Sequence, residues 1–253
     1  MDTNNTVIEE KINTEDRLFH YTDFDSLIKI INSKTFKFNR SDKLNDKNEY
    51  MINEVLFDDF SEIKRYFKDY KYEEYESSLK EHSRFYSFSM TYSPYESISM
   101  WKMYGKQENL KIRIDFPRDI FEGLFRENNL YSEAGSKIIN GKPLFDVKSI
   151  CILDKIDYIK VDTEKELLMK KIVDKYGFIK YEAWKYEEEE RALVKLKRND
   201  KAIFLKLNEE FIKRIHVTFN PWISKEFYEI LKQYLDKYEI ESSCSSYHNK
   251  VIL

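Results

Sequence analysis

Hydrophobic and polar residues alternate in several short segments of the chain, a pattern typical of half-buried β-strands. The clearest case is residues 110–116, LKIRIDF, in which every second side chain is apolar. The same period of two predicts further strands. They are expected at residues 17–22, 35–40, 84–90, 147–153, 156–161, 201–207 and 213–219.

Between these strands, apolar residues recur three and four positions apart, which predicts amphipathic helices. Phe24, Leu27 and Ile31 show this spacing just after Thr22, which with Asp25 resembles a capping box. Strands that follow one another in the second half of the chain favour an α+β fold with a mostly antiparallel sheet and peripheral helices. Residues 131–146 are expected to be a loop, and further helices are expected at residues 50–81, 98–106, 118–130, 163–181 and 224–238.

The organisation of the chain is simple. Residues 1–16 are polar and acidic, and we expect a flexible N-terminal arm there. No long linker follows, so residues 17–253 are read as one α+β domain, with a charged helical insertion around residues 58–81. The sequence shows no signal peptide and no apolar run of membrane length. A cytoplasmic protein without membrane association is therefore expected.

The composition excludes several classes of function. A net charge of -3 argues against a general binder of nucleic acid or of membrane surfaces. With 5 glycines, the chain has neither a GxGxxG nor a GxxxxGK[ST] loop, which excludes the commonest nucleotide-binding loops but not nucleotide binding itself. The 4 histidines and 2 cysteines show no metal-ligand spacing, so we expect no metal site.

The most unusual segment is WKYEEEERALVKL, which contains four consecutive glutamates. Read as a strand, it places Glu187, Glu189 and Arg191 on one face. Neighbouring carboxylates raise each other's pKa and a guanidinium lowers both, so such a group can be tuned for chemistry. Read as a helix, the same residues form an ordinary ion pair between Glu187 and Arg191 on a solvated face. The segment alone leaves both interpretations open.

Four segments in a fixed order resemble a bacterial family, domain-of-unknown-function family 2971. They are LFHYTDFDSLIKII with the following TFKFNRSDKLNDKNEY, then RFYSFSM, then MWKMYG, and last W-x-Y-E-x-E-x-R beginning at Trp184. The layout of that family in turn is similar to that of ADP-ribosyltransferases. This resemblance implies a split sheet and a cleft that binds NAD, as a substrate, without a glycine loop.

The resemblance also implies roles for individual residues. Glu189 would stabilise the oxocarbenium ion that forms when nicotinamide leaves NAD, and Glu187 would orient or deprotonate the acceptor. Arg191 would hold the two acids or pair with pyrophosphate. The residues expected to contact NAD are His20 at the ribose hydroxyls, Tyr104 or Trp101 stacked on nicotinamide, and Tyr21, Ser87 and Ser89 beside them.

The function that the resemblance implies is transfer of ADP-ribose from NAD to a macromolecular acceptor, protein or nucleic acid, or hydrolysis of NAD. A toxin or phage-defence effector, with a protein partner of a defence system, is the setting expected for such a chain. One alternative is a non-catalytic binding or sensor module on the same fold. Another is a metal-dependent nuclease-like toxin that uses Glu187, Glu189 and Asp46.

Each candidate residue also has a purely structural interpretation. His20 can be a hydrogen-bonded structural histidine, and Trp101 and Tyr104 can be core aromatics. A catalytic cleft requires, in addition, that the candidate residues lie close together in the fold. His20 on the first strand and Glu187 and Glu189 on a late strand must then line one pocket with Tyr104 on its wall.

Overall fold

In a computed structural model of the chain, the described residues are 17–44, 84–106, 110–126, 129–133, 137–138, 150–160, 163, 177–196, 200–248 and 250. The expected arm at residues 1–16 and the expected insertion at residues 58–81 lie outside them, as does Asp46. The described part has mixed α and β structure with a large, mostly antiparallel sheet, as the order of elements predicts.

Two sheets are found in the described residues. The larger contains β1 (Arg17–Asp23), β2 (Thr35–Arg40), β3 (Phe85–Thr91), β4 (Lys111–Pro117), β5 (Leu130–Ser132), β6 (Lys137–Ile138), β7 (Ile150–Lys155), β10 (Glu189–Lys195), β11 (Ile203–Lys206), β12 (His216–Phe219) and β13 (Glu241–Cys244). The smaller contains β8 (Asp157–Ile159) and β9 (Ile179–Tyr181). Only the pairs β12–β13 and β8–β9 are parallel among the described strands.

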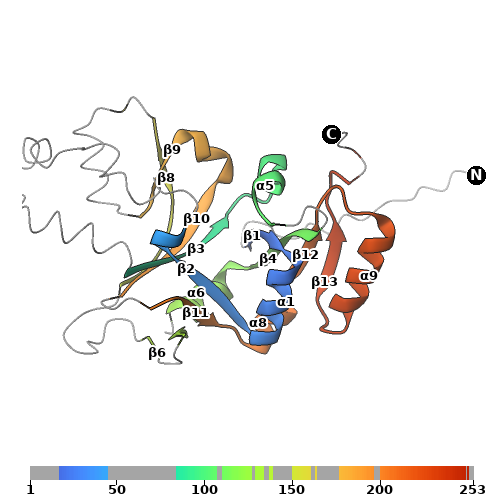
Figure 1. Cartoon of the computed structure of the whole chain (residues 1–253), viewed down its shortest axis with the longest axis horizontal. Helices are drawn as coiled ribbons and strands as arrows, with labels where there is room; N and C mark the ends of the chain where they lie inside the picture. The colour runs from blue at the N-terminus through green and yellow to red at the C-terminus, as the bar shows by residue number, and fades with distance from the viewer. Residues whose placement is uncertain are drawn as a thin grey trace, which may run out of the picture.

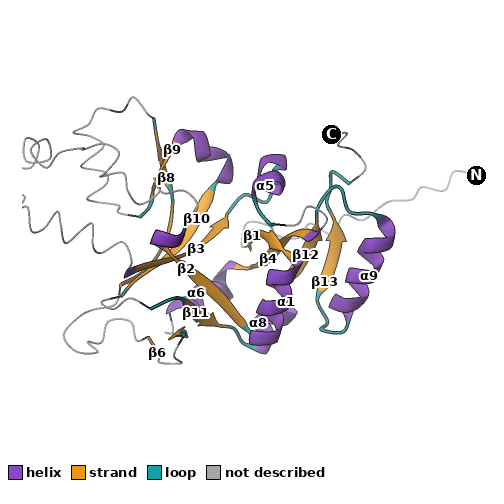
Figure 2. Ribbon diagram, viewed as in Figure 1, coloured by secondary structure: helices purple, strands orange, loops and turns teal. Residues whose placement is uncertain are grey.

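Short helices lie around the large sheet (Figures 1 and 2). They are α1 (Phe24–Ser33), α5 (Ile98–Met103), α6 (Arg118–Arg126), α8 (Glu209–Lys213) and α9 (Lys225–Asp236), with 3-10 helices η2 (Ser41–Lys43) and η5 (Glu182–Glu187). Helix α1 begins one residue later than its capping pattern suggests. The side chain of Asp23, not Thr22, accepts a hydrogen bond from the Ser26 amide at 2.8 Å, because β1 continues through Asp23.

Strand β3 is the point at which the large sheet splits, because two different strands share one of its edges. Strand β10 pairs with one edge of β3 along its whole length, from Thr91 to Phe85. The other edge is shared, because β1 pairs with it at Thr91 whereas β2 pairs with it at Ser87 and Tyr86. Among the described ladder pairs, none occupies this edge at residues 88–90. Strands β1 and β2 therefore separate here and leave a gap beside β3.

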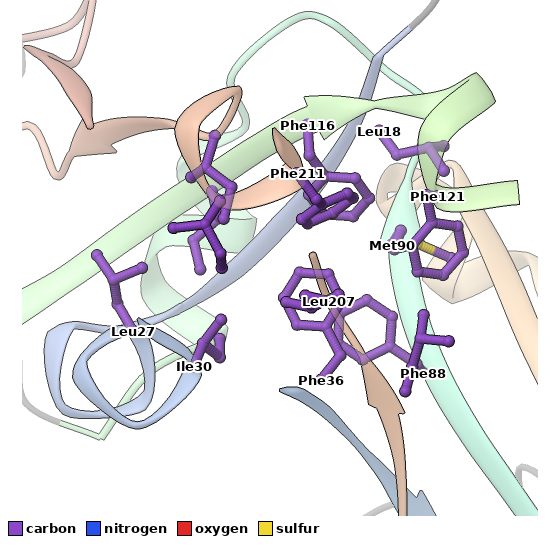
Figure 3. Close-up of a cluster of buried hydrophobic side chains, with 14 of the residues drawn as sticks. Leu18, Leu27, Ile30, Phe36, Phe88, Met90, Phe116, Phe121, Leu207 and Phe211 are labelled. Carbon is purple, nitrogen blue, oxygen red and sulfur yellow. The ribbon is translucent and has the colours of Figure 1, made fainter. Parts of the chain in front are cut away.

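One face of the large sheet is covered by α1, α6, α8 and α9, whose apolar side chains join those of the strands in one core (Figure 3). Phenylalanine dominates this core. The Phe36 ring centroid lies 4.7 Å from that of Phe88, 5.3 Å from that of Phe116 and 5.5 Å from that of Phe211. Rings at these separations add specific contacts to the burial of apolar area. This face supplies most of the apolar burial in the described fold.

The opposite face carries smaller clusters. Helix α5 packs here, with Met100 and Trp101 against Tyr21 of β1. Phe178, just before β9, joins Phe85 and Leu193 in another cluster on this face. Between the two clusters the strands present polar and charged side chains, so this face has room for a site.

Three expectations about elements were wrong. Residues 179–181 form β9, although a helix was expected to continue to residue 181; residues 164–176 of that helix lie outside the described residues. Gly177 has a φ of 83°, a conformation that suits glycine and ends regular structure before β9. Strands β5 and β6 lie in or next to the expected loop at residues 131–146, and β13 was not expected. These strands are short and are stabilised by pairing with distant segments, which a local pattern does not record.

Candidate functional site

A cavity of about 220 Å³ lies beside β3, where β1 and β2 separate from each other. It brings together seven of the residues singled out in the sequence, namely His20, Tyr21, Ser87, Ser89, Tyr104, Glu187 and Glu189. These residues come from three distant parts of the chain, namely β1, then β3 and the end of α5, and last η5 and β10. They surround one cavity, as a single cleft requires. Their chemical roles remain predictions.

His20 occupies the gap itself. Its Nδ1 lies 2.9 Å from the carbonyl oxygen of Ser89, which belongs to the part of β3 without a ladder partner on this edge. A carbonyl only accepts hydrogen bonds, so Nδ1 carries the proton and Nε2 keeps its lone pair in the neutral ring. Burial lowers the pKa of His20 despite this hydrogen bond, and the ring is therefore neutral near pH 7. Its ring centroid lies 4.5 Å from that of Phe88.

The two acids that line the cavity, Glu187 and Glu189, are joined by a turn and do not lie on one continuous strand. Glu187 ends the 3-10 helix η5, Glu188 adopts a left-handed conformation with a φ of 42°, and β10 begins at Glu189. The expectation that Glu187 belongs to the strand was therefore wrong. The turn also leaves the side chain of Tyr186 exposed. The turn nevertheless leaves Glu187 and Glu189 close enough to share one cation.

That cation is Lys180 of β9. Its Nζ lies 2.6 Å from Oε2 of Glu187 and 2.6 Å from Oε2 of Glu189. All three side chains are buried, with both glutamates only 2% exposed. Charges removed from water are tolerated when they are paired, and the lysine bridge neutralises much of the repulsion between the two acids.

Arg191 is the second cation of this charged group and pairs with Glu189 away from the cavity. Its Nε donates to Oε1 of Glu189 at 2.8 Å, and its Nη1 donates to the carbonyl of Gly177 at 2.6 Å. Arg191 is fully buried and does not line the cavity. Of the two roles considered for it, holding the acids in place is compatible with this position, and direct contact with pyrophosphate is not.

The environments of the two acids push their pKa values in opposite directions. Burial opposes ionisation of Glu189, but the charges of Arg191 and Lys180 outweigh it and lower the pKa of Glu189 to about 2. Burial raises the pKa of Glu187, although Lys180 and a hydrogen bond from Tyr104 act against it. Glu189 is thus a fixed negative charge, and Glu187 is the acid of the pair that binds a proton more readily.

Two tyrosines support this arrangement. The hydroxyl of Tyr104, which follows α5, donates to Oε1 of Glu187. The hydroxyl of Tyr158 in β8 accepts a hydrogen bond from the Glu189 amide at 2.9 Å. The small sheet therefore helps to position both acids, because Tyr158 and Lys180 come from its two strands.

Trp101 is the other predicted site residue outside the cavity. It is fully buried between α5 and β1, and its indole nitrogen donates to Glu96 at 3.0 Å. Stacking on nicotinamide, which was expected of Trp101 or Tyr104, is geometrically open only to Tyr104. Among the described residues, no group of three or more histidine, cysteine or acidic side chains is arranged to hold a metal ion. The nuclease alternative also requires Asp46, which lies outside them.

Lys180 was missed in the sequence because it was assigned to the end of a helix. The segment Phe178-Ile179-Lys180-Tyr181, directly after Gly177, is compatible with a short strand. Nothing in the local pattern, however, indicates that this lysine faces Glu187 and Glu189, which follow it after η5 and the turn at Glu188. That contact depends on the parallel pairing of β9 with β8.

Comparison of the chain with family models, with curated proteins and with solved structures finds no match. The resemblance to domain-of-unknown-function family 2971 therefore stays a prediction from the sequence motifs. Separately, no described helix is long and apolar enough to cross a membrane.

Proposed function

We propose that the protein is an ADP-ribosyltransferase-like enzyme that binds the nicotinamide riboside part of NAD in this cavity. The observation that carries the proposal is the convergence of His20, Tyr104, Glu187 and Glu189 from three distant segments around one cavity. The acceptor of ADP-ribose is a macromolecule, protein or nucleic acid, or water when NAD is hydrolysed. A toxin or phage-defence effector is the setting that we infer for this activity.

The size of the cavity supports one end of the dinucleotide as its occupant. Sites for drug-sized ligands measure about 300–1,000 Å³. The volume of about 220 Å³ lies below that range, so the cavity accommodates one moiety and not a whole dinucleotide. Tyr104 offers a ring for stacking on nicotinamide, and the unprotonated Nε2 of His20 accepts a hydrogen bond from a ribose hydroxyl.

In the proposed reaction, the bond between the ribose carbon and the nicotinamide nitrogen breaks, and nicotinamide leaves with the bonding electron pair. Positive charge develops on the ribose, and the ionised Glu189 stabilises it. The acceptor then forms a bond to the same ribose carbon and passes its proton to Glu187. The pKa of Glu187 is raised by burial, which makes this carboxylate the better proton acceptor of the two.

A second candidate function is a non-catalytic binding or sensor module. It is favoured by the charge balance of the site, where two acids meet two cations in a buried network. Such a network can hold a fold together without doing chemistry. In that case the cavity recognises a ligand or partner, and NAD is not consumed.

The deciding experiment measures release of free nicotinamide when the purified protein is incubated with NAD, with and without cell lysate. We expect turnover by the parent and a loss of roughly 10²–10³-fold in Glu189→Gln, which keeps the shape but removes the charge. The matched control is Glu190→Gln. Glu190 is the next residue, equally buried at 3% exposed, but it pairs with Arg118 and does not line the cavity.

Glu190→Gln should retain activity within a few-fold of the parent, and both variants should keep a cooperative thermal transition. No nicotinamide release from the parent under any of these conditions would reject the enzyme and favour the binding module. Equal losses in the two variants would mean that general damage to β10, not the charge of Glu189, lowers the activity.

A further inference from the structure

A second, larger cavity lies on the same face of the large sheet. Its volume is about 530 Å³, within the range of about 300–1,000 Å³ that small-molecule sites occupy. Phe19 of β1 lines both cavities, so they are neighbours. The walls of the second cavity come from β1, β4, β12, β13 and the segments next to them.

Two of the three acids that line this second cavity, Asp115 and Glu96, accept hydrogen bonds from donors of the protein, whereas the third, Glu241 of β13, is exposed. Asp115 accepts from Nε of Arg17, and its other oxygen lies 2.9 Å from Nδ1 of His216. Glu96 accepts from the amide of Ser246 at 2.8 Å and from the indole of Trp101 at 3.0 Å. The hydrogen-bonding capacity of both carboxylates is largely used inside the fold, so neither offers an open site for a cation.

Arg113 of β4 is different. It lines the second cavity and is 8% exposed, yet its Nε has no hydrogen-bond partner among the described residues. Its position is nevertheless well defined. Nη1 donates to the carbonyl of Pro94 at 3.2 Å, and the guanidinium carbon lies 4.6 Å from the ring centroid of Phe19. A buried donor without an acceptor costs roughly 1–3 kcal/mol, and more when it is charged, so a ligand atom that accepts from Nε would be stabilised here.

The guanidinium of Arg113 favours an acceptor that carries negative charge. The lining includes four cations and three acids, the cations being Arg17, Arg113, Lys213 and Arg214. Arg17 pairs with Asp115, Lys213 with Glu239 and Arg214 with Glu210, so Arg113 is the cation that attracts an anion here. The hydroxyl groups of Thr218, Ser243 and Ser246 also lie around the cavity. Phosphate and carboxylate groups match both features, since they accept several hydrogen bonds and fit the planar fork of a guanidinium.

We propose that the second cavity binds an oxyanion, the phosphate or carboxylate group of a small molecule, through Arg113. Phe19 supports the flat face of the guanidinium, and Pro94 holds its orientation through Nη1. The guanidinium is therefore already oriented before the anion arrives, which lowers the entropic cost of binding. This site does not depend on the NAD chemistry proposed for the neighbouring cavity.

The test follows the Nε–H resonance of Arg113 by NMR in ¹⁵N-labelled protein, assigned by its absence from the spectrum of Arg113→Lys. Inorganic phosphate and acetate are titrated separately, at ionic strength kept constant with chloride. We expect a saturating shift of this resonance. Saturation by phosphate alone identifies a phosphate site, and saturation by acetate alone identifies a carboxylate site.

Binding in the variants is followed through the backbone amide of Thr218. Arg113→Met should weaken binding roughly tenfold to a hundredfold, the loss of a charge-assisted hydrogen bond. Arg113→Lys keeps the charge without the fork and should also bind more weakly. Arg126→Met removes one exposed arginine on α6 and should bind as the parent does. Glu189→Gln should do the same, because this site is separate from the other cavity.

Two results would overturn the proposal. One is the absence of a saturating shift with either anion. The other is equal binding by the parent and both Arg113 variants, which would place the anion elsewhere. If Arg113→Met does not fold, Arg113→Lys and the direct observation of the Nε–H group still decide the question.

Discussion

The two faces of the large sheet are made by the same strands and yet differ in kind. On the face covered by α1, α6, α8 and α9, the side chains are apolar and meet in a continuous core (Figure 3). On the other face, the strands and η5 present charged residues that are buried just as deeply. Glu187, Glu189 and Arg191 are each no more than 2% exposed.

The difference lies in how each face tolerates change. An apolar core is held by many small contacts, so the cost of a substitution follows the volume that is lost. A buried charged network depends on a few named partners, and removing one leaves another charge without compensation. The apolar face thus accounts for the stability of the described fold, and the charged face is where a small change in one side chain alters chemistry.

The largest effect is expected from Phe36→Ala in the apolar face. Phe36 is fully buried against Phe88, Phe116 and Phe211, so its removal leaves a cavity that the neighbours fill only in part. We expect a loss of about 3–5 kcal/mol in the free energy of unfolding, measured by urea denaturation. Tyr95→Ala, at a side chain 81% exposed, should change it by less than about 0.5 kcal/mol. A similar small loss for Phe36→Ala would mean that the core is not packed as described.

A slightly smaller loss of stability is expected from Lys180→Met in the charged face. This change leaves Glu187 and Glu189 buried without their shared cation, although Arg191 still pairs with Glu189. We expect a loss of about 3 kcal/mol in the free energy of unfolding, the lower end for breaking a buried ion pair. Lys185→Met, at an exposed lysine of η5, is the control and should have little effect. Unchanged stability of Lys180→Met would show that the network does not hold the fold.

The apolar face was the easier one to predict from the sequence. Strand β2 has the bounds that the alternation in TFKFNR predicts, and β4 differs from its predicted range by one residue at each end. The alternation records directly which side chains enter the core, because neighbouring residues of a strand point to opposite faces. Local patterns are therefore sufficient for these two strands, whereas α8 on the same face was not expected.

The charged face could be predicted only in part. The convergence of His20, Tyr104, Glu187 and Glu189 was expected, because the resemblance to ADP-ribosyltransferases requires these residues to line one cleft. The role of Lys180 was not, because its contacts depend on a pairing between two very short strands. Lys180 lies only 7 residues before Glu187, but η5 and the turn at Glu188 come between them, so neither a strand period nor a helix period relates these residues.

A third prediction concerns how Arg191→Met changes the response to acid. In the parent, the pKa of Glu189 is lowered from 4.5 to about 2, so its contribution to stability is complete above pH 4.5. That contribution is lost as the pH falls from 4.5 to about 2. Without Arg191 the pKa rises toward 4.5, and stability should fall less steeply over this interval. Urea unfolding at a series of acidic pH values measures the slope, with Arg126→Met as the control. An identical slope in parent and variant would show that Arg191 does not set the charge of Glu189.

The smallest effect is expected from Tyr104→Phe, which removes one hydroxyl and keeps the aromatic ring. The hydrogen bond from Tyr104 favours the ionised form of Glu187, so its loss should raise the pKa of Glu187 further. If Glu187 accepts the proton of the acceptor, the acidic limb of the pH–rate profile for nicotinamide release moves to higher pH. We expect a shift of less than about one pH unit, which corresponds to roughly 1.4 kcal/mol. Tyr95→Phe, at an exposed side chain, should leave the profile unchanged. A lower rate at every pH without a shift would mean that Tyr104 acts on the bound substrate and not on Glu187.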